Sequence, residues 1–139
     1  MLRLNNDTRW DLTYEMIDRI LKLRGPIDTF VVAAMNKHGG EMKKEHREQL
    51  AADQLKSVDW MELEEMHALL KPFKSITMEL QGDLNDERMN SAIFDVLPSF
   101  DYLLQHLEDA KKKFTGKSTM ATSINLAWLK LNEYYEKAT

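Results

Sequence analysis

Few residue clusters in this sequence combine the types and the spacing that a chemical step requires. The most suggestive is Gly116-Lys117-Ser118-Thr119, because phosphate-binding loops end in Gly-Lys-Ser/Thr at the start of a helix. Such a loop also needs a glycine five positions earlier, where bare backbone amides wrap the phosphates, and here that position is Lys111. We therefore interpret the segment as the start of a helix with Ser118 as its N-cap.

Metal, acid–base and nucleophilic sites also lack their spacing signals. The histidines include no pair four residues apart, as a metal-binding pair on one helix face would be; they are His38, His46, His67 and His106. The sequence has no cysteine, which excludes thiol catalysis and cysteine-ligated zinc. Carboxylates are numerous, but their linear spacing does not place two of them in one cleft. We therefore expect no enzymatic activity, no metal, no cofactor and no small-molecule substrate.

A single basic cluster stands out, and it consists of Lys111, Lys112, Lys113 and Lys117. These lysines could contact phosphates or an acidic partner, although lysines at the end of a helix also suit its macrodipole. The whole chain has 19 basic and 23 acidic residues, a formal charge of −4. This balance argues against strong non-specific binding of nucleic acid, so any DNA contact would be local.

The apolar pattern that must position any site is helical. Apolar residues recur at steps of three and four and never alternate as in a strand, which predicts an all-α fold. The first predicted helix begins at Asp7 or Thr8 and stops at Gly25-Pro26. The second begins at Pro26 and ends at His38-Gly39-Gly40. We expect these two helices to form an antiparallel pair.

The middle of the chain contains one ambiguous segment and one long helix. Residues 41–56 carry mixed charges and few large apolar side chains, so they form either a solvated helix or a mobile excursion. Ser57 is predicted to cap a helix that ends at Gly82. Pro72 lies inside this helix and is expected to kink it, because proline removes a backbone donor and clashes with the preceding turn.

Two further helices complete a predicted bundle of about five. One presents a nearly continuous apolar stripe, made by Ala92, Ile93, Val96, Leu97, Phe100, Leu103, Leu104 and Leu107. Pro98 is expected to kink this helix or to mark a fresh start. After a break around Thr115-Gly116, the last helix runs from about Ser118 to Glu136. Its predicted apolar side consists of Ile124, Ala127, Trp128, Leu131, Tyr134 and Tyr135.

The 139 residues have the length and composition of one folded unit, so we expect a single helical domain over residues 1–139. No apolar stretch approaches the ~18 residues of a membrane-spanning helix. The N-terminus also lacks the apolar centre of a signal peptide. These features predict an intracellular protein without membrane contact.

Four stretches match segments of one known family. NDTRWDLTYEMI, residues 6–17, is similar to its TRW-N-S-T-Y-x-M-L segment, and LLKPFKSIT, residues 69–77, to its L-x-P-F-x-x-x-T helix. VLPSFDYLLQHLE, residues 96–108, is similar to V-L-P-x-F-x-x-L-L-x-H-L-E, and SINLAWLKLNEYY, residues 123–135, to S-I-N-x-A-W-x-K-L-x-x-Y-Y. In this order they resemble the hAT-superfamily transposases, most closely the copies in filamentous ascomycete fungi.

The resemblance implies that this chain descends from a transposase but lacks the transposase's catalytic residues. In that family a ribonuclease H-like domain uses Asp, Asp and Glu to hold divalent metal, and a helical domain is inserted before the Glu. The matches place this chain at the start of the insertion, so the catalytic triad is absent. Arg9-Trp10 match a pair near the family's active site, where the tryptophan stacks on a flipped base. Asp11-Leu12 replace the usual Asn-Ser, and the alternative role for Trp10 is packing in the helical core.

These observations lead to three expectations about function. The first is a non-catalytic helical protein derived from a hAT transposase, acting through a protein partner or as a homodimer. The second is residual binding of transposon-end DNA through Arg9, Trp10, Lys111, Lys112, Lys113 and Lys117. The third is a fungal small effector or regulator recruited from a transposase fragment. Descent from a transposase also implies a nuclear location.

Overall fold

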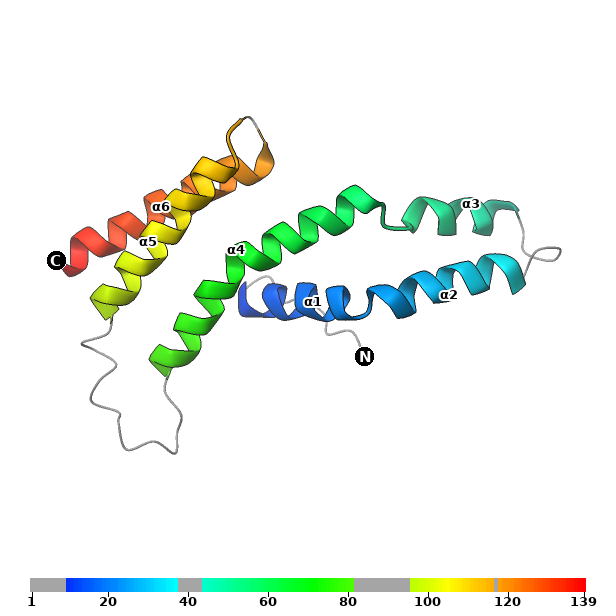
Figure 1. Cartoon of the computed structure of the whole chain (residues 1–139), viewed down its shortest axis with the longest axis horizontal. Helices are drawn as coiled ribbons and strands as arrows, with labels where there is room; N and C mark the ends of the chain where they lie inside the picture. Colours follow the sequence, from blue (N-terminus) through cyan, green and yellow to red (C-terminus); the bar gives the residue numbers. More distant parts are fainter. Residues whose placement is uncertain (1–9, 38–43, 82–95, 117) are drawn as a thin grey trace. The chain divides into compact units, whose positions relative to one another are not determined.

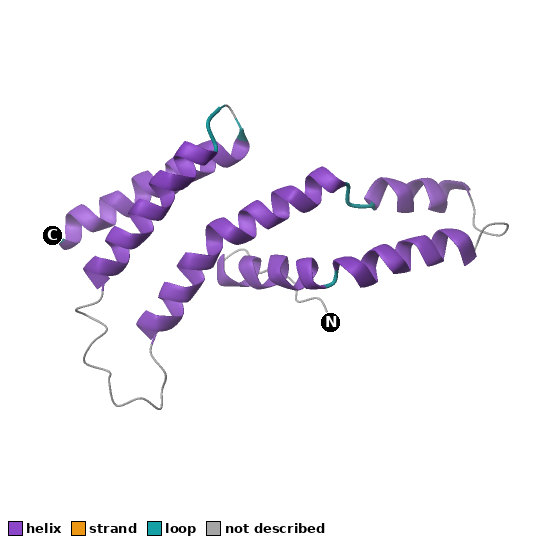
Figure 2. Cartoon of the chain, in the orientation of Figure 1, coloured by secondary structure: helices purple, strands orange, loops and turns teal. Residues whose placement is uncertain are grey.

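The fold is all-α, as predicted (Figure 2). The structure, a computed structural model, describes residues 10–37, 44–81, 96–116 and 118–139, without the side chains of Trp10, Lys37 and Gln81. The described residues form six helices and no strand. The helices are α1 (Trp10–Lys22), α2 (Arg24–Lys37), α3 (Lys44–Asp53), α4 (Ser57–Gln81), α5 (Val96–Lys113) and α6 (Thr119–Ala138).

The chain divides into two compact units, and the single domain expected over residues 1–139 stays a prediction. Unit 1 is Met1–Ala68 and contains α1, α2, α3 and the first part of α4. Unit 2 is Leu69–Thr139 and contains the rest of α4 with α5 and α6. Several predicted helix ends lie outside the described residues, namely Asp7, Thr8, His38, Gly39, Gly40, Gly82, Ala92 and Ile93.

The boundary between the first two helices differs from the prediction. α1 ends at Lys22, and Gly25 and Pro26 lie in the first turn of α2, where a missing backbone donor has no intrahelical bond to lose. The amide of Ile27 donates to the carbonyl of Leu23 at 2.9 Å, so helical bonding continues across the one residue between the helices. The chain therefore does not reverse there. α1 and α2 follow each other nearly in line, and the expected antiparallel pair is absent (Figure 1).

The reversal in unit 1 comes later, between α2 and α3. α3 forms within residues 41–56 as a helix without a buried residue. It lies beside α2, and the first part of α4 continues beside α1 (Figure 1). At the start of α4, the backbone amide of Lys56 donates to the Asp59 carboxylate at 2.7 Å. The side chain that caps the N-terminus of α4 is thus that of Asp59 and not that of the predicted Ser57. Among the described residues of unit 1, the buried apolar ones are Ile17, Val31 and Trp60.

Unit 2 is built on an antiparallel hairpin of α5 and α6 (Figure 1). Gly116 adopts a positive φ of 133° in the connection, and Ser118 accepts a hydrogen bond from the amide of Ala121 at 3.1 Å. The predicted helix break and the predicted Ser118 cap are therefore confirmed. Pro98 lies in the first turn of α5 as described, where proline is tolerated, and Pro72 lies inside α4.

The core of unit 2 joins all three of its helices. Leu107 and Ala110 of α5 pack with Ile124 of α6, and Leu69 and Phe73 of α4 pack against this cluster. A ring nitrogen of His106 lies 3.0 Å from the Leu69 carbonyl oxygen, which can only accept, so the imidazole donates. α4 is thus held on the hairpin by apolar burial and by one directional bond.

Candidate functional site

The predicted basic cluster is largely engaged inside its own unit. The Lys111 ammonium lies 4.0 Å from the centre of the Trp128 ring, and that of Lys113 lies 5.3 Å from the centre of the Phe114 ring. Lys112 forms a 3.0 Å ion pair with Asp109, which raises the pKa of Lys112. Lys117 lies outside the described residues. The structure therefore brings together Lys111, Lys112 and Lys113 at the end of α5, with intramolecular partners for their charges.

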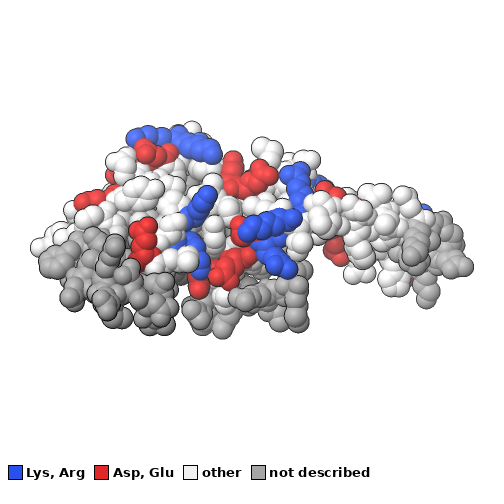
Figure 3. Space-filling view, turned by 60° about the horizontal axis from the view of Figure 1, so that its bottom comes forward, with Lys and Arg blue, Asp and Glu red and all other residues white. Residues whose placement is uncertain are grey.

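The other half of the predicted DNA contact belongs to unit 1. Arg9 lies outside the described residues, and Trp10 begins α1 with a side chain that is not described. The alternative role of Trp10, packing in the helical core, therefore stays a prediction. On the face that Figure 3 presents, basic and acidic side chains are interleaved and do not form a broad basic patch. This pattern is unlike the single-sign surface on which proteins bind the DNA backbone.

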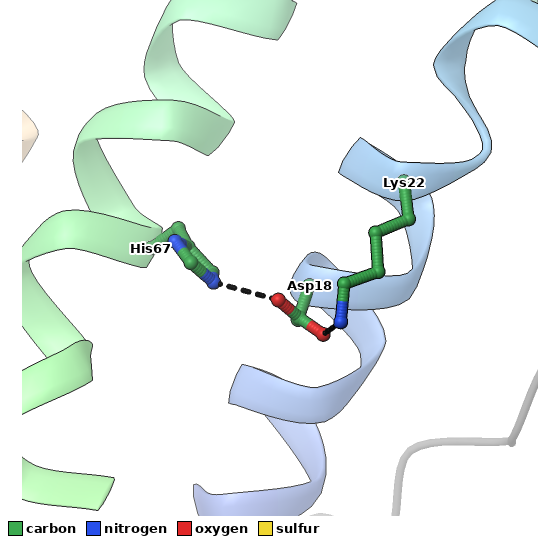
Figure 4. Close-up of polar contacts among 3 residues, drawn as sticks. All are labelled: Asp18, Lys22 and His67. Atoms are coloured by element: carbon green, nitrogen blue, oxygen red, sulfur yellow. Dashed lines mark hydrogen bonds and ion pairs between the residues drawn. The ribbon is translucent and has the colours of Figure 1, made fainter. Parts of the chain in front are cut away.

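A polar cluster that sequence reasoning missed links α1 to α4 in unit 1 (Figure 4). His67 Nε2 lies 3.0 Å from Asp18 Oδ1, and Lys22 Nζ lies 2.6 Å from Asp18 Oδ2. The Tyr14 ring stacks on the His67 ring with 4.8 Å between centroids. The hydrogen bond from Lys22 and then that from His67 lower the pKa of Asp18, against the opposing effect of burial.

A second link joins α4 to Arg24, the first residue of α2, at positions that precede His67 along α4. The Arg24 guanidinium lies 5.0 Å from the centre of the Trp60 ring and 3.4 Å from a carboxylate oxygen of Glu64. Together with Asp18 and His67, these contacts fix the register of α4 against the α1–α2 segment. A carboxylate that orients a histidine also occurs in catalytic sites. Here Tyr14 covers a face of the imidazole, and in the described part of the chain no three His, Asp or Glu side chains converge as metal ligands.

The Asp18 cluster makes stability depend on pH in a defined direction. Because the pKa of Asp18 is lowered on folding, its contribution is fully present above its ordinary value of 3.8 and is lost as pH falls below that value. We expect Asp18→Asn to lower the free energy of unfolding by about 1 kcal/mol at neutral pH, and by progressively less below 3.8. Urea unfolding of the variant and of the unmodified chain, at neutral pH and again below pH 3.8, measures the difference in the free energy of unfolding.

Asp28→Asn is the matched control for that measurement. Asp28 is another half-buried aspartate of unit 1, and within the described residues it has no ion pair. An equal, pH-independent loss in both variants would contradict the assigned role of Asp18.

One side of α6 carries exposed apolar residues. Leu126, Leu129 and Tyr134 are largely exposed, whereas Ile124 is buried against α5. Glu133 sits beside them and pairs with Lys130 at 2.9 Å and with Lys137 at 2.6 Å; the hydrogen bonds from Lys137 and Lys130 lower its pKa. We call the surface made by Leu126, Leu129, Lys130, Glu133, Tyr134 and Lys137 the outer face of α6.

Unit 2 also contains a groove of about 540 Å³ between α4 and α5. Its lining mixes the apolar side chains of Pro72, Ile76 and Pro98 with Tyr102, Lys71 and Glu79. Opposite charges and scattered hydroxyl groups do not select one class of ligand, so the groove by itself indicates no substrate.

Comparisons of the chain with protein-family models, with curated proteins and with solved structures found no match. The hAT resemblance therefore rests on the four sequence stretches alone. Among the described helices, none is both long enough and apolar enough to cross a lipid bilayer.

Proposed function

We propose that this chain is a non-catalytic helical protein, derived from a fragment of a hAT transposase, that associates with a second copy of itself. The outer face of α6 is the proposed contact surface. The observation that carries the proposal is that α6 is apolar on two opposite sides, of which the described residues of unit 2 cover only one.

The geometry of α6 separates these two sides clearly. Leu126 lies two residues after Ile124, which is roughly 200° around a helix of 3.6 residues per turn. Ile124 is fully buried, while Leu126 is 62% exposed and Leu129 is 53% exposed. A helix that is apolar on both sides is typical of a helix that packs between two neighbours. One neighbour is α5, and the second copy supplies the other.

The charges on the outer face suit a symmetric contact. Lys130 and Lys137 flank Glu133, and both ammonium groups also lie near the Tyr134 ring, at 5.0 and 5.9 Å from its centre. This gives two leucines and a tyrosine beside a polar rim that carries both signs, as interfaces usually have. In a two-fold dimer the same patch faces itself, so Glu133 of each copy can pair with a lysine of the other copy. The patch is small, so we expect a weak and reversible dimer.

The proposed descent gives a reason for such a surface. The four matched stretches lie in family order, and the resemblance places the chain within the helical insertion of the transposase. A helix of that insertion packs against other parts of the parent, and its face is exposed when the fragment stands alone. Descent from a transposase also supports a nuclear location.

Residual DNA binding has less support from the described residues. Lys111 and Lys112 already contact Trp128 and Asp109, and a phosphate would have to compete with those partners. A role as a fungal effector or regulator stays an expectation from the resemblance, since no contact in the described residues favours it.

The proposal is tested by replacing Leu126 and Leu129 together with glutamate. We expect the parent chain to show a mass in sedimentation velocity that rises with concentration toward that of a dimer. The double variant should stay a monomer throughout the same series, because four carboxylates would face one another in the dimer. If the unmodified chain stays monomeric at every concentration, the proposal is overturned.

A matched control uses Val58 and Met61, which are also exposed, also three residues apart, and lie on α4 in unit 1. Replacing both with glutamate makes the same change in charge and likewise removes two exposed apolar side chains. This control should dimerise like the parent. Loss of the dimer in both variants would show that general charge, and not the outer face of α6, decides association.

A further inference from the structure

A small cavity in unit 1 lies where α2, the end of α3 and the start of α4 meet. Its volume is about 170 Å³. Pockets for whole small-molecule ligands are usually larger, about 300–1,000 Å³. This volume instead suits one long side chain that enters from a partner.

The inner wall of the cavity is apolar. Val31 and Trp60, both buried, line it together with Leu50 and Leu55. An occupant therefore needs an aliphatic or aromatic body, because an apolar wall gives a polar body no hydrogen bonds in place of those it makes with water.

Two carboxylates complete the lining, one from each of two helices. Asp28 belongs to α2 and is half buried, and Asp53 is the last residue of α3 and is exposed. Within the part of the chain that the structure describes, neither carboxylate forms an ion pair or a hydrogen bond. Nearby Arg24 is already engaged by Glu64 and Trp60. The described residues of unit 1 thus supply no cation that compensates the charge of the cavity.

We propose that this cavity binds a lysine or arginine side chain presented by a partner protein. Both side chains have an apolar stem and a cationic head, and they commonly lay the stem along apolar surface while the head reaches polar groups. Here the stem contacts Val31, Leu50 and Trp60, and the head pairs with Asp28 and Asp53. The charge-assisted hydrogen bonds of a cation to carboxylates supply the selectivity. The site lies in unit 1 and does not depend on the outer face of α6.

The test titrates the ¹⁵N-labelled full chain with Nα-acetyl-arginine methylamide and with Nα-acetyl-lysine methylamide, followed by amide and indole NMR signals. Nα-acetyl-norleucine methylamide is the control ligand, because it has a stem of similar length without charge. We expect saturable shifts of the Trp60 indole N–H and of the backbone amides around Asp28 and Asp53 with at least one of the two basic ligands. Norleucine should bind about tenfold more weakly or not at all.

A pair of variants then assigns the carboxylates. Asp28→Asn combined with Asp53→Asn should weaken binding of the basic ligand about tenfold or more. The control combines Glu62→Gln with Glu108→Gln, which removes the same charge from two exposed positions on α4 and α5 and should leave affinity unchanged. Three results would overturn the proposal: no saturable shift, equal binding of norleucine, or unchanged affinity in the aspartate variant. The ligand comparison uses the parent chain, so it decides the matter even if that variant does not fold.

Discussion

Ile124→Ala is expected to lower the free energy of unfolding by about 2–5 kcal/mol. Ile124 is 0% exposed and packs with Leu107 and Ala110, so truncation removes buried apolar atoms and leaves a cavity among three helices. Folded domains of this size are stable by only about 5–15 kcal/mol, so such a loss is a large fraction of the total. Urea unfolding followed by circular dichroism measures it.

The control for this change is Leu126→Ala, two residues away on the same helix. Leu126 lies on the outer face of α6, and we expect the monomer to lose no more than about 0.5 kcal/mol. Amide hydrogen exchange adds a local test, because protection in α5 and α6 should fall in the Ile124 variant only. Similar losses of stability in both variants would mean that α6 does not face α5 as described.

Trp60→Ala is expected to have a comparable effect in unit 1, about 3–5 kcal/mol. Trp60 is 3% exposed, so its removal takes a large buried aromatic side chain out of this unit. The change also removes the ring over which the Arg24 guanidinium lies at 5.0 Å. Arg24 would keep only its contact with Glu64, an exposed pair of small energetic value.

Met61→Ala is the matched control for the tryptophan change. Met61 is the next residue of α4 and is 60% exposed, so truncation should cost little. Thermal unfolding at one protein concentration compares the two variants with the parent. If the Trp60 variant has the same unfolding temperature as the unmodified chain, the packing of α4 against α2 and the cavity lined by Trp60 are contradicted.

Much of the fold was predictable because its determinants are local. Helical steps of apolar residues identified every described helix except α3, which was one of two alternatives for residues 41–56. Gly116 and Ser118 lie where the break and the last N-cap were expected. Leu103 and Leu107, two residues of the predicted apolar stripe in α5, are buried. Helix propensity, capping and turn conformation depend on residues only a few positions away, so they can be deduced from the sequence alone.

The prediction failed where local signals were equally compatible with two structures. Gly25-Pro26 can stop a helix or begin one, and only the hydrogen bond from Ile27 to Leu23 shows that the chain continues nearly straight. Tyr134 was assigned to the apolar side of the last helix, yet it is half exposed and lies beside two lysines. At 3.6 residues per turn Tyr134 lies at the edge of the buried stripe, where spacing alone does not distinguish a core position from an exposed one.

The sequence by itself therefore determined the helical class, most of the helix limits and much of the apolar core of unit 2, because these depend on short-range spacing. Only the tertiary structure decided which residues share a site. Asp18 meets His67 across 49 positions, and the cavity between Asp28 and Asp53 needs three helices to enclose it. Such contacts depend on where the chain reverses, and the energies that choose the reversal are spread over many weak contacts rather than encoded in one motif.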